Sequence, residues 1–141
     1  MSACWRAPLS ASDRLVEAAR AARDRAVAPY SHFKVGAALQ AADGTIITGC
    51  NVENASYGLT ICAERVAVVK ALSEGHHAFT RLVVVTDTEE PTSPCGACRQ
   101  VLWEFAPDLE VVLANLHRIT AVTTLRDLLP LAFNSHLLRR P

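Results

Sequence analysis

The sequence predicts an α/β domain built on a mixed β-sheet. Stretches with apolar residues at helical spacing alternate with short stretches rich in β-branched residues. Roughly two dozen residues separate an apolar strand at 82–85 from one at 109–113, which leaves room for a helical crossover and favours parallel pairing. Only a few residues separate 109–113 from a further strand at 119–123, so the last two strands should be antiparallel.

The first third of the chain predicts one helix and one β-hairpin. Apolar residues recur at helical intervals over residues 12–28, and Pro29 should end this helix because proline lacks an amide hydrogen. Residues 33–41 alternate with a period of two. The turn signal Asp43-Gly44 and the β-branched run at 45–48 follow them, which predicts a hairpin.

The polar segment 49–58 predicts a loop, and an apolar helical pattern follows it. We expect Thr60 to be the N-cap of this helix and Gly75 to lie just past its end. Cys62 and Glu64 would then lie in the first helical turn. A loop carries functional side chains more often than a strand does, but from its spacing alone this segment is better interpreted as a solvated connection.

Two more helices are predicted in the second half of the chain. Residues 96–105 have an apolar helical pattern that Pro107 ends, so Cys95 and Cys98 lie at the start of a helix. The segment Thr124–Asp127 resembles a capping box that opens a short helix, which Pro130 limits.

Composition narrows the class of protein. We expect one domain over residues 1–141, with 1–10 and 135–141 loosely ordered. Fourteen Lys and Arg balance fourteen Asp and Glu, which argues against a nucleic-acid or membrane partner and favours a small neutral substrate. No segment has the pattern of a signal peptide or a bilayer span, so a cytoplasmic location is expected. The five cysteines should then remain reduced.

Three cysteines predict a catalytic zinc site. Cys62 begins the run Cys-Ala-Glu-Arg, and Cys95 and Cys98 have the C-x-x-C spacing that lets two sulfurs bind one ion. A structural zinc ion usually has four protein ligands, whereas a catalytic one has three and an open position. We therefore expect one Zn²⁺ per chain, with Glu64 as general acid and base and Arg65 donating hydrogen bonds to the sulfurs.

Each of these residues also has a simpler interpretation. A glutamate in the first turn often only stabilises the helix dipole, as Glu64 could, and an arginine such as Arg65 is common on a helix surface. Cys50 follows a predicted strand and is better explained as a buried thiol than as a fourth ligand.

The chain resembles the small, homotetrameric class of cytidine deaminase over nearly its whole length. Cys62-Ala63-Glu64 and Pro94-Cys95-Gly96-Ala97-Cys98 match the zinc deaminase signature in order. Residues 33–38, Phe-Lys-Val-Gly-Ala-Ala, and residues 51–57, Asn-Val-Glu-Asn-Ala-Ser-Tyr, are similar to the nucleoside-binding segments of that class. The resemblance implies a three-layer α/β/α fold with a five-stranded mixed sheet.

The resemblance also implies roles for single residues. Phe33 would stack near the pyrimidine, Asn51 and Glu53 would hydrogen-bond the ribose, and Ala63 would belong to the substrate site. Tyr57 would help form a subunit contact around the site, and Phe133 would reach a neighbouring subunit's pocket.

The reaction implied is hydrolytic deamination of cytidine and 2′-deoxycytidine in pyrimidine salvage. Water activated by zinc attacks C4, and Glu64 carries protons to N3 and to the departing amine. The resemblance further implies a homotetramer.

Four other interpretations remain open at this point. A non-enzymatic zinc module would need Cys50 as a fourth ligand, and a thioredoxin-like protein would use Cys95 and Cys98 alone. An enzyme that edits nucleic acids should have a basic surface. A blasticidin-type deaminase shares the cysteine segments, but Asn51 and Glu53 favour a substrate that contains ribose.

Overall fold

The structure is a computed structural model that describes residues 11–138. The expectation that residues 1–10 and 139–141 are loosely ordered lies outside the described residues. Ser135–Leu138, which belongs to the same expectation, forms a short 3₁₀-helix, η2.

A five-stranded mixed sheet forms the centre of the fold, with strand order β2-β1-β3-β4-β5. The strands are β1 (Val35–Ala41), β2 (Ile46–Cys50), β3 (Phe79–Thr86), β4 (Glu110–Ala114) and β5 (Ile119–Thr124). β1 and β2 form the predicted antiparallel hairpin. β3 and β4 are parallel, whereas β4 and β5 are antiparallel, so the strand directions predicted from the connection lengths are confirmed.

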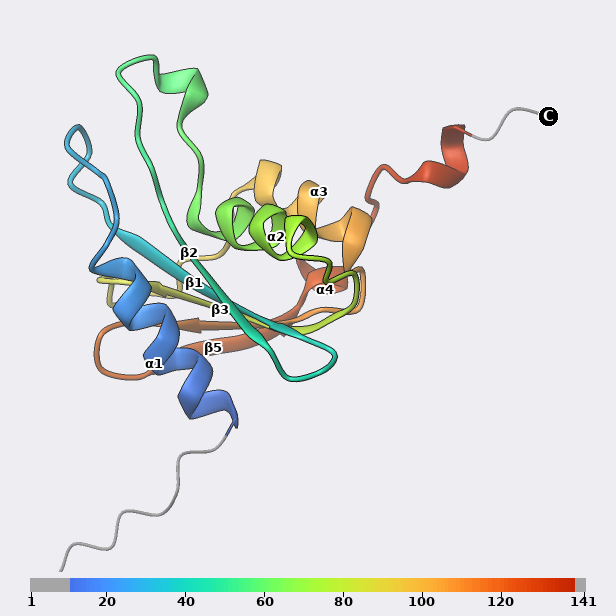
Figure 1. Ribbon diagram of the computed structural model, residues 1–141, viewed down its shortest axis with the longest axis horizontal. Coiled ribbons are helices and arrows are strands. Elements are labelled where there is room, and N and C mark those ends of the chain that lie inside the picture. Colours follow the sequence, from blue (N-terminus) through green and yellow to red (C-terminus); the bar gives the residue numbers. More distant parts are fainter. Residues whose placement is uncertain (1–10, 139–141) are drawn as a thin grey trace, which may run out of the picture.

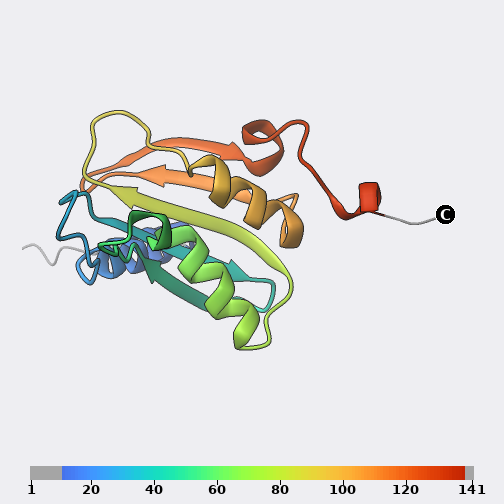
Figure 2. The same cartoon turned by 90° about the horizontal axis from the view of Figure 1, so that it is seen from above.

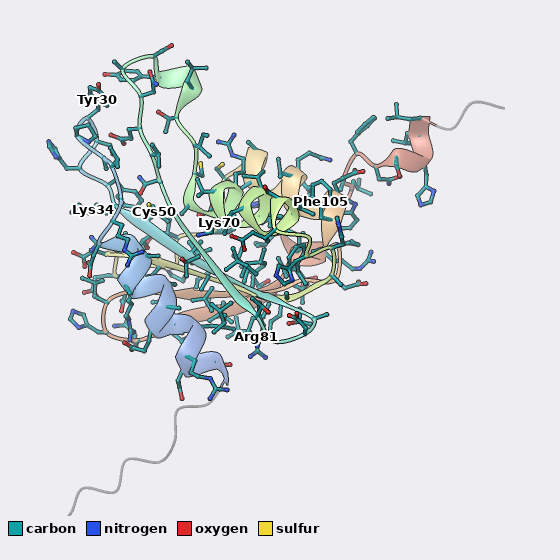
Figure 3. All side chains as sticks on the ribbon, viewed as in Figure 1. Tyr30, Lys34, Cys50, Lys70, Arg81 and Phe105 are labelled. Atoms are coloured by element: carbon teal, nitrogen blue, oxygen red, sulfur yellow. The ribbon has the colours of Figure 1, made fainter. Side chains whose placement is uncertain are left out.

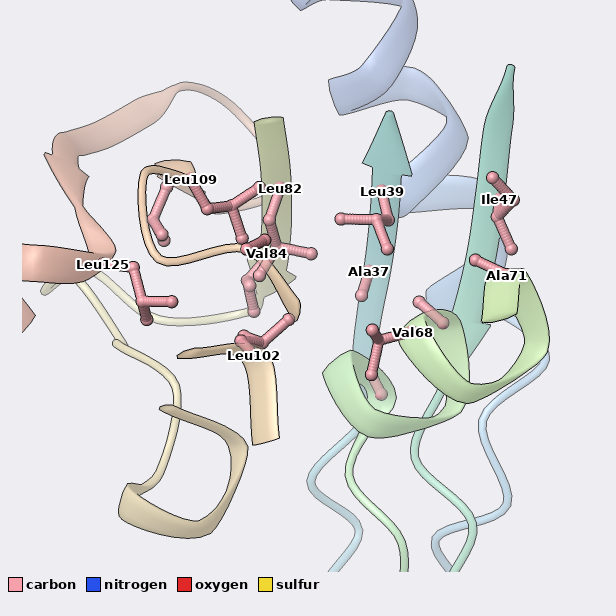
Figure 4. Packing of buried hydrophobic residues seen from close by; sticks show 14 of the residues in the cluster. Ala37, Leu39, Ile47, Val68, Ala71, Leu82, Val84, Leu102, Leu109 and Leu125 are labelled. Carbon is pink, nitrogen blue, oxygen red and sulfur yellow. The ribbon is translucent and has the colours of Figure 1, made fainter. Parts of the chain in front are cut away.

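Helices cover both faces of the sheet and give the expected three layers. α1 (Ala11–Arg23) lies on one face, and α2 (Ala63–Ser73) and α3 (Gly96–Phe105) lie on the other (Figures 1 and 2). Side chains of β3 alternate between two cores: Leu82 and Val84 face α2 and α3, and Val83 and Val85 face α1. Figure 4 shows the first of these cores. The continuous apolar run predicted a strand buried on both faces, and this is confirmed.

Two predicted helix boundaries are wrong for a shared reason. The first helix ends at Arg23 rather than residue 28, because the Val27 amide donates to the Asn51 carbonyl at 3.0 Å. The N-cap of α2 is Cys62 rather than Thr60, because Ile61 forms a β-bridge with Val52 and stays extended. Cys62 therefore precedes the first turn of α2, and only Glu64 lies in it.

The same pairing creates two segments that project side by side from the sheet, residues 24–34 and 50–62, which we call the arm segments (Figure 1). Tyr30 lies near the tip of the first segment, whereas Lys34 and Cys50 lie near the base (Figure 3). Tyr30 contacts Tyr57 of the second segment edge to face, with the ring centroids 5.8 Å apart. α2 begins where the second segment returns to the body of the protein.

α4 (Leu125–Leu128) begins as the capping box predicted. The Thr124 hydroxyl oxygen accepts a hydrogen bond from the Asp127 amide at 3.2 Å. None of the helices within residues 11–138 combines the length and hydrophobicity that a membrane crossing requires.

Gly49 lets the start of α2 pack directly on β2. A Cβ atom added at Gly49 would lie 2.4 Å from the Ala63 carbonyl oxygen and 2.6 Å from the Ala67 amide nitrogen, both of which are backbone atoms. Gly49→Ala should therefore lower the free energy of unfolding by about 1–3 kcal/mol, as overpacking does. It should also weaken metal binding, because α2 positions Cys62.

Urea denaturation followed by circular dichroism measures the change in unfolding free energy. Gly58→Ala is the matched control, because a Cβ atom there meets nothing within 4 Å. Equal stability of the two variants would contradict the close packing of α2 on β2.

Candidate active site

Three sulfur atoms from two helix starts form one cluster. Cys62 is the N-cap of α2, Cys95 is the N-cap of α3, and Cys98 lies in the first turn of α3. The Cys95 sulfur lies 3.8 Å from the Cys62 sulfur and 3.5 Å from the Cys98 sulfur. All three ligand atoms lie within 4.8 Å of one another. The cluster predicted from the cysteine spacing is thus formed.

The spacing of the sulfurs fits a tetrahedral zinc ion. Zinc–thiolate bonds of about 2.3 Å at tetrahedral angles place the sulfurs about 3.8 Å apart. In the part of the chain that the structure describes, this group of metal-ligating side chains contains neither Cys50 nor Glu64. The donor set is therefore three thiols, which is the number that a catalytic zinc site uses.

The surroundings of Cys62 favour its thiolate form. The adjacent Cys98 thiol and the Arg65 guanidinium, whose Nη2 donates to the Cys62 sulfur at 3.5 Å, lower the pKa of Cys62 to about 5. The pKa of Cys98 is raised, because its thiol donates to Cys62 and is buried. Negative charge therefore accumulates first on Cys62, and a divalent cation would allow all three sulfurs to ionise together.

Glu64 lies beside the cysteines and is almost fully buried, with an exposed fraction of 5%. Burial raises the pKa of its carboxyl group above the ordinary value, and the nearby Cys62 thiolate acts in the same direction. A carboxyl group with a raised pKa can both accept and return a proton closer to neutral pH. Stabilisation of the helix dipole alone would not require this burial.

One cavity of about 310 Å³ collects most of the predicted site residues, a volume in the range of small-molecule sites. It lies between the two arm segments, the end of β3 and the start of α2. The predicted residues that line it are Phe33, Asn51, Glu53, Cys62, Ala63, Glu64 and Cys95.

Asn51 and Glu53 hold the backbone of the first arm segment. The Asn51 side chain accepts a hydrogen bond from the Val35 amide at 2.8 Å and donates one to the Phe33 carbonyl at 2.7 Å. The Glu53 carboxylate accepts from the Tyr30 and Ser31 amides and from the Ser31 hydroxyl. The Ser31 hydroxyl is the main cause of a lowered pKa at Glu53. Both side chains therefore fix Phe33 at the cavity.

Tyr57 and Phe133 do not line this cavity. Tyr57 is 74% exposed on the 3₁₀-helix η1 (Tyr57–Leu59) of the second arm segment. Phe133 is 54% exposed beyond α4, where its carbonyl accepts a hydrogen bond from the Gln100 side chain at 2.7 Å. Within one chain, neither side chain is part of the cavity wall that contains Cys62 and Cys95.

The cavity also contains residues that sequence reasoning missed, among them Ser31, Thr86, Thr92 and Ser93. Polar residues directly after a buried strand were the available signal for Thr86.

Sequence reasoning also missed Arg99. Its guanidinium donates to the Pro94 carbonyl, the Ser93 hydroxyl and the Leu128 carbonyl, each at 2.7 Å. It thereby fixes the segment that carries Cys95.

Known proteins are similar to this chain in sequence and in fold. Residues 9–114 match the family described as the cytidine and deoxycytidylate deaminase zinc-binding region. A cytidine deaminase of Sporosarcina psychrophila is 52% identical over 86% of this chain and 90% of its own length. The crystal structure of a cytidine deaminase from Burkholderia pseudomallei, 56% identical, superposes with a TM-score of 0.82 over 85% of this chain and 97% of that one.

A blasticidin-S deaminase of Bacillus cereus is more distant. It is 34% identical over 70% of this chain and 76% of its own length.

Proposed function

Since this chain belongs to the cytidine deaminase family, we propose that it hydrolyses cytidine and 2′-deoxycytidine to uridine and 2′-deoxyuridine with release of ammonia. Such a reaction serves the salvage of pyrimidine nucleosides. The observation that carries the proposal is a buried carboxylate, Glu64, in the same cavity as a cluster of three thiols at zinc-binding distances. A closed structural zinc site would not need that carboxylate.

Cys62, Cys95 and Cys98 would hold the zinc ion. Zinc acts as a Lewis acid that makes water a better nucleophile near neutral pH. Glu64 accepts a proton from the water that attacks C4 of the pyrimidine and delivers it to N3. It then accepts the proton of the hydroxyl group formed at C4, which becomes the product carbonyl, and delivers this proton to the departing amine. The raised pKa of Glu64 suits a group that must accept and release a proton twice in each turnover. Arg65 offsets part of the negative charge on the sulfurs through its contact with Cys62.

The far end of the cavity suits a sugar. A carboxylate has about four lone-pair sites, and Glu53 uses three of them on Tyr30 and Ser31, so one remains for a ribose hydroxyl. Asn51 retains one amide hydrogen beyond the one it gives to Phe33. Phe33 provides an apolar face for the pyrimidine, and Ala63 lies in the cavity wall beside Glu64.

Self-association would complete the site. Tyr57 and Phe133 are large, exposed and outside the cavity of their own chain. A homotetramer could place such residues at the cavities of neighbouring subunits. A net charge of zero argues against nucleic acid as a partner, and we place the enzyme in the cytoplasm, where thiol ligands stay reduced.

Substrate size tests the proposal. The parent chain should deaminate cytidine and 2′-deoxycytidine, and should be much slower on cytosine, because binding energy from the sugar helps to orient the base. Cytidine monophosphate and single-stranded oligonucleotides should be poor substrates, because a second negative charge would approach Glu53. Ammonia release measured over this panel, with blasticidin S included, separates the nucleoside activity from its alternatives.

Glu53→Gln should reduce kcat/KM for cytidine by at least about 10-fold, the effect of removing a hydrogen bond from a charged group. Glu53→Ala should reduce it further, because it also frees Tyr30 and Ser31. Glu104→Gln, at an exposed carboxylate of α3, is the control. Unimpaired Glu53 variants, or deamination of an oligonucleotide or of blasticidin S as fast as cytidine, would refute the nucleoside assignment.

A further inference from the structure

Three threonines at one wall of the cavity share one network of hydroxyl groups. Thr86 ends β3 and is only 2% exposed, and Thr88 and Thr92 lie in the loop that leads from β3 to Cys95. The Thr88 hydroxyl oxygen lies 2.9 Å from the Thr86 hydroxyl oxygen and 2.9 Å from that of Thr92. Thr88 is thus the centre of the network.

The direction of these hydrogen bonds can be worked out. The Thr88 hydroxyl has a single hydrogen, and it donates that hydrogen to the Glu90 carbonyl oxygen at 2.8 Å, because a carbonyl can only accept. Thr86 and Thr92 must therefore be the donors in their contacts with Thr88. Their hydrogens point toward Thr88, and their oxygens can only accept hydrogen bonds from other groups.

Thr88 itself is held in place from a second side. The buried Asn115 side chain donates to the Thr88 carbonyl at 3.1 Å, and its oxygen accepts from the His117 and Arg118 amides. Asn115 thus holds the backbone of Thr88, and the Glu90 carbonyl holds its hydroxyl group. The two contacts together orient the hydroxyl groups of Thr86 and Thr92.

Thr86 and Thr92 both line the cavity that contains Cys62, Glu64 and Cys95. Thr92 lies three residues before Cys95, so this wall of the cavity reaches the cysteine cluster. Asn51 and Glu53 hydrogen-bond the first arm segment and, in the proposed function, the sugar. Glu64 is the residue proposed to contact the N3 edge of the pyrimidine. Because the hydroxyl hydrogens of Thr86 and Thr92 are used on Thr88, the hydroxyl oxygens in this wall can only accept a hydrogen bond from a ligand.

We infer that the hydroxyl oxygens of Thr86 and Thr92 accept hydrogen bonds from the exocyclic amine of the bound pyrimidine, and that Thr88 is the positioning residue that orients them. This inference rests on the proposed function. An amine at C4 donates hydrogen bonds, whereas the carbonyl that replaces it in the product cannot. The wall therefore favours the substrate over the product and assists product release.

Binding to a chain that cannot turn over tests the inference. In a Glu64→Gln background loaded with zinc, titration calorimetry gives the dissociation constants of cytidine and uridine, and their ratio reports the preference for the amine. Thr88→Val keeps the shape but removes the acceptor, so Thr86 and Thr92 can rotate and donate to a carbonyl. The preference for cytidine over uridine should then fall about 3- to 10-fold, the contribution of one hydrogen bond.

Thr88→Ser keeps the hydroxyl and should retain the parental ratio. Thr86→Val and Thr92→Val should each weaken cytidine binding without weakening uridine binding, and they decide the same question if Thr88→Val does not fold. Thr120→Val is the control, because Thr120 donates to the Leu113 carbonyl on β4 and does not line the cavity. An unchanged ratio in Thr88→Val, or equal weakening of both ligands, would overturn the inference.

The failure of the inference can be distinguished from that of the proposed function. Cytidine turnover by the parent chain together with an unchanged ratio in the threonine variants overturns only the inference. Absence of turnover by the zinc-loaded parent overturns the proposed function and the inference with it.

Discussion

Replacing Glu64 by glutamine should lower kcat for cytidine by about 100- to 10,000-fold or more, while zinc remains bound. General acid and base catalysis is worth about that much, and Glu64 is the group proposed to carry every proton in the reaction. Glutamine has the same shape but cannot accept or return a proton. The free energy of unfolding should not fall, because the substitution removes a buried charge, which is costly to desolvate.

Steady-state kinetics, zinc content and urea denaturation of the same preparation check these three expectations together. Glu74→Gln is the matched control, because Glu74 is exposed at the other end of α2. Near-parental kcat in Glu64→Gln would mean that Glu64 only stabilises the helix dipole. A loss of zinc together with activity would mean that Glu64 supports the metal site instead of the proton transfers.

Cys95→Ser should weaken zinc binding by more than about 100-fold, the upper range for loss of a residue that only supports a metal ligand, and should abolish turnover. The serine hydroxyl has nearly the same size, but it does not ionise near neutral pH. The helix start should persist, because serine is a favoured N-cap residue.

Competition with a chelator of known affinity measures the zinc dissociation constant of each variant. Cys50→Ser is the control, because Cys50 lies outside the group of three sulfurs. Parental zinc affinity in Cys95→Ser, or a loss of zinc in Cys50→Ser, would show that the three-cysteine ligand set is wrong.

Local patterns predicted those parts of the fold that depend on local interactions. The helix predicted at 96–105 has the observed bounds, and the strand directions follow from connection lengths alone. The end of α1 and the start of α2 were missed because β-bridges from Val52 to Val27 and to Ile61 keep those residues extended. Such long-range backbone pairing leaves no periodic signal in the sequence.

The candidate site was likewise predicted where it depends on local spacing and missed where it depends on how distant segments pack. The C-x-x-C spacing and the Cys-Ala-Glu run predict the metal cluster, because a helix start holds sulfurs at fixed separations. The contacts of Glu53 with Tyr30 and Ser31 could not be predicted, because they depend on how the arm segments fold against each other. The threonine wall was missed because its chemistry depends on the direction of hydrogen bonds and not on which residues are present.

The claim that a single zinc ion at three cysteines drives cytidine deamination is tested most directly by a zinc titration. Zinc is added stepwise to the chelator-treated chain, and bound zinc and uridine formation are measured at each step. We expect uridine formation to rise in proportion to bound zinc and to level off at one zinc per chain. Full turnover without zinc, or no turnover at one bound zinc per chain, would contradict this claim.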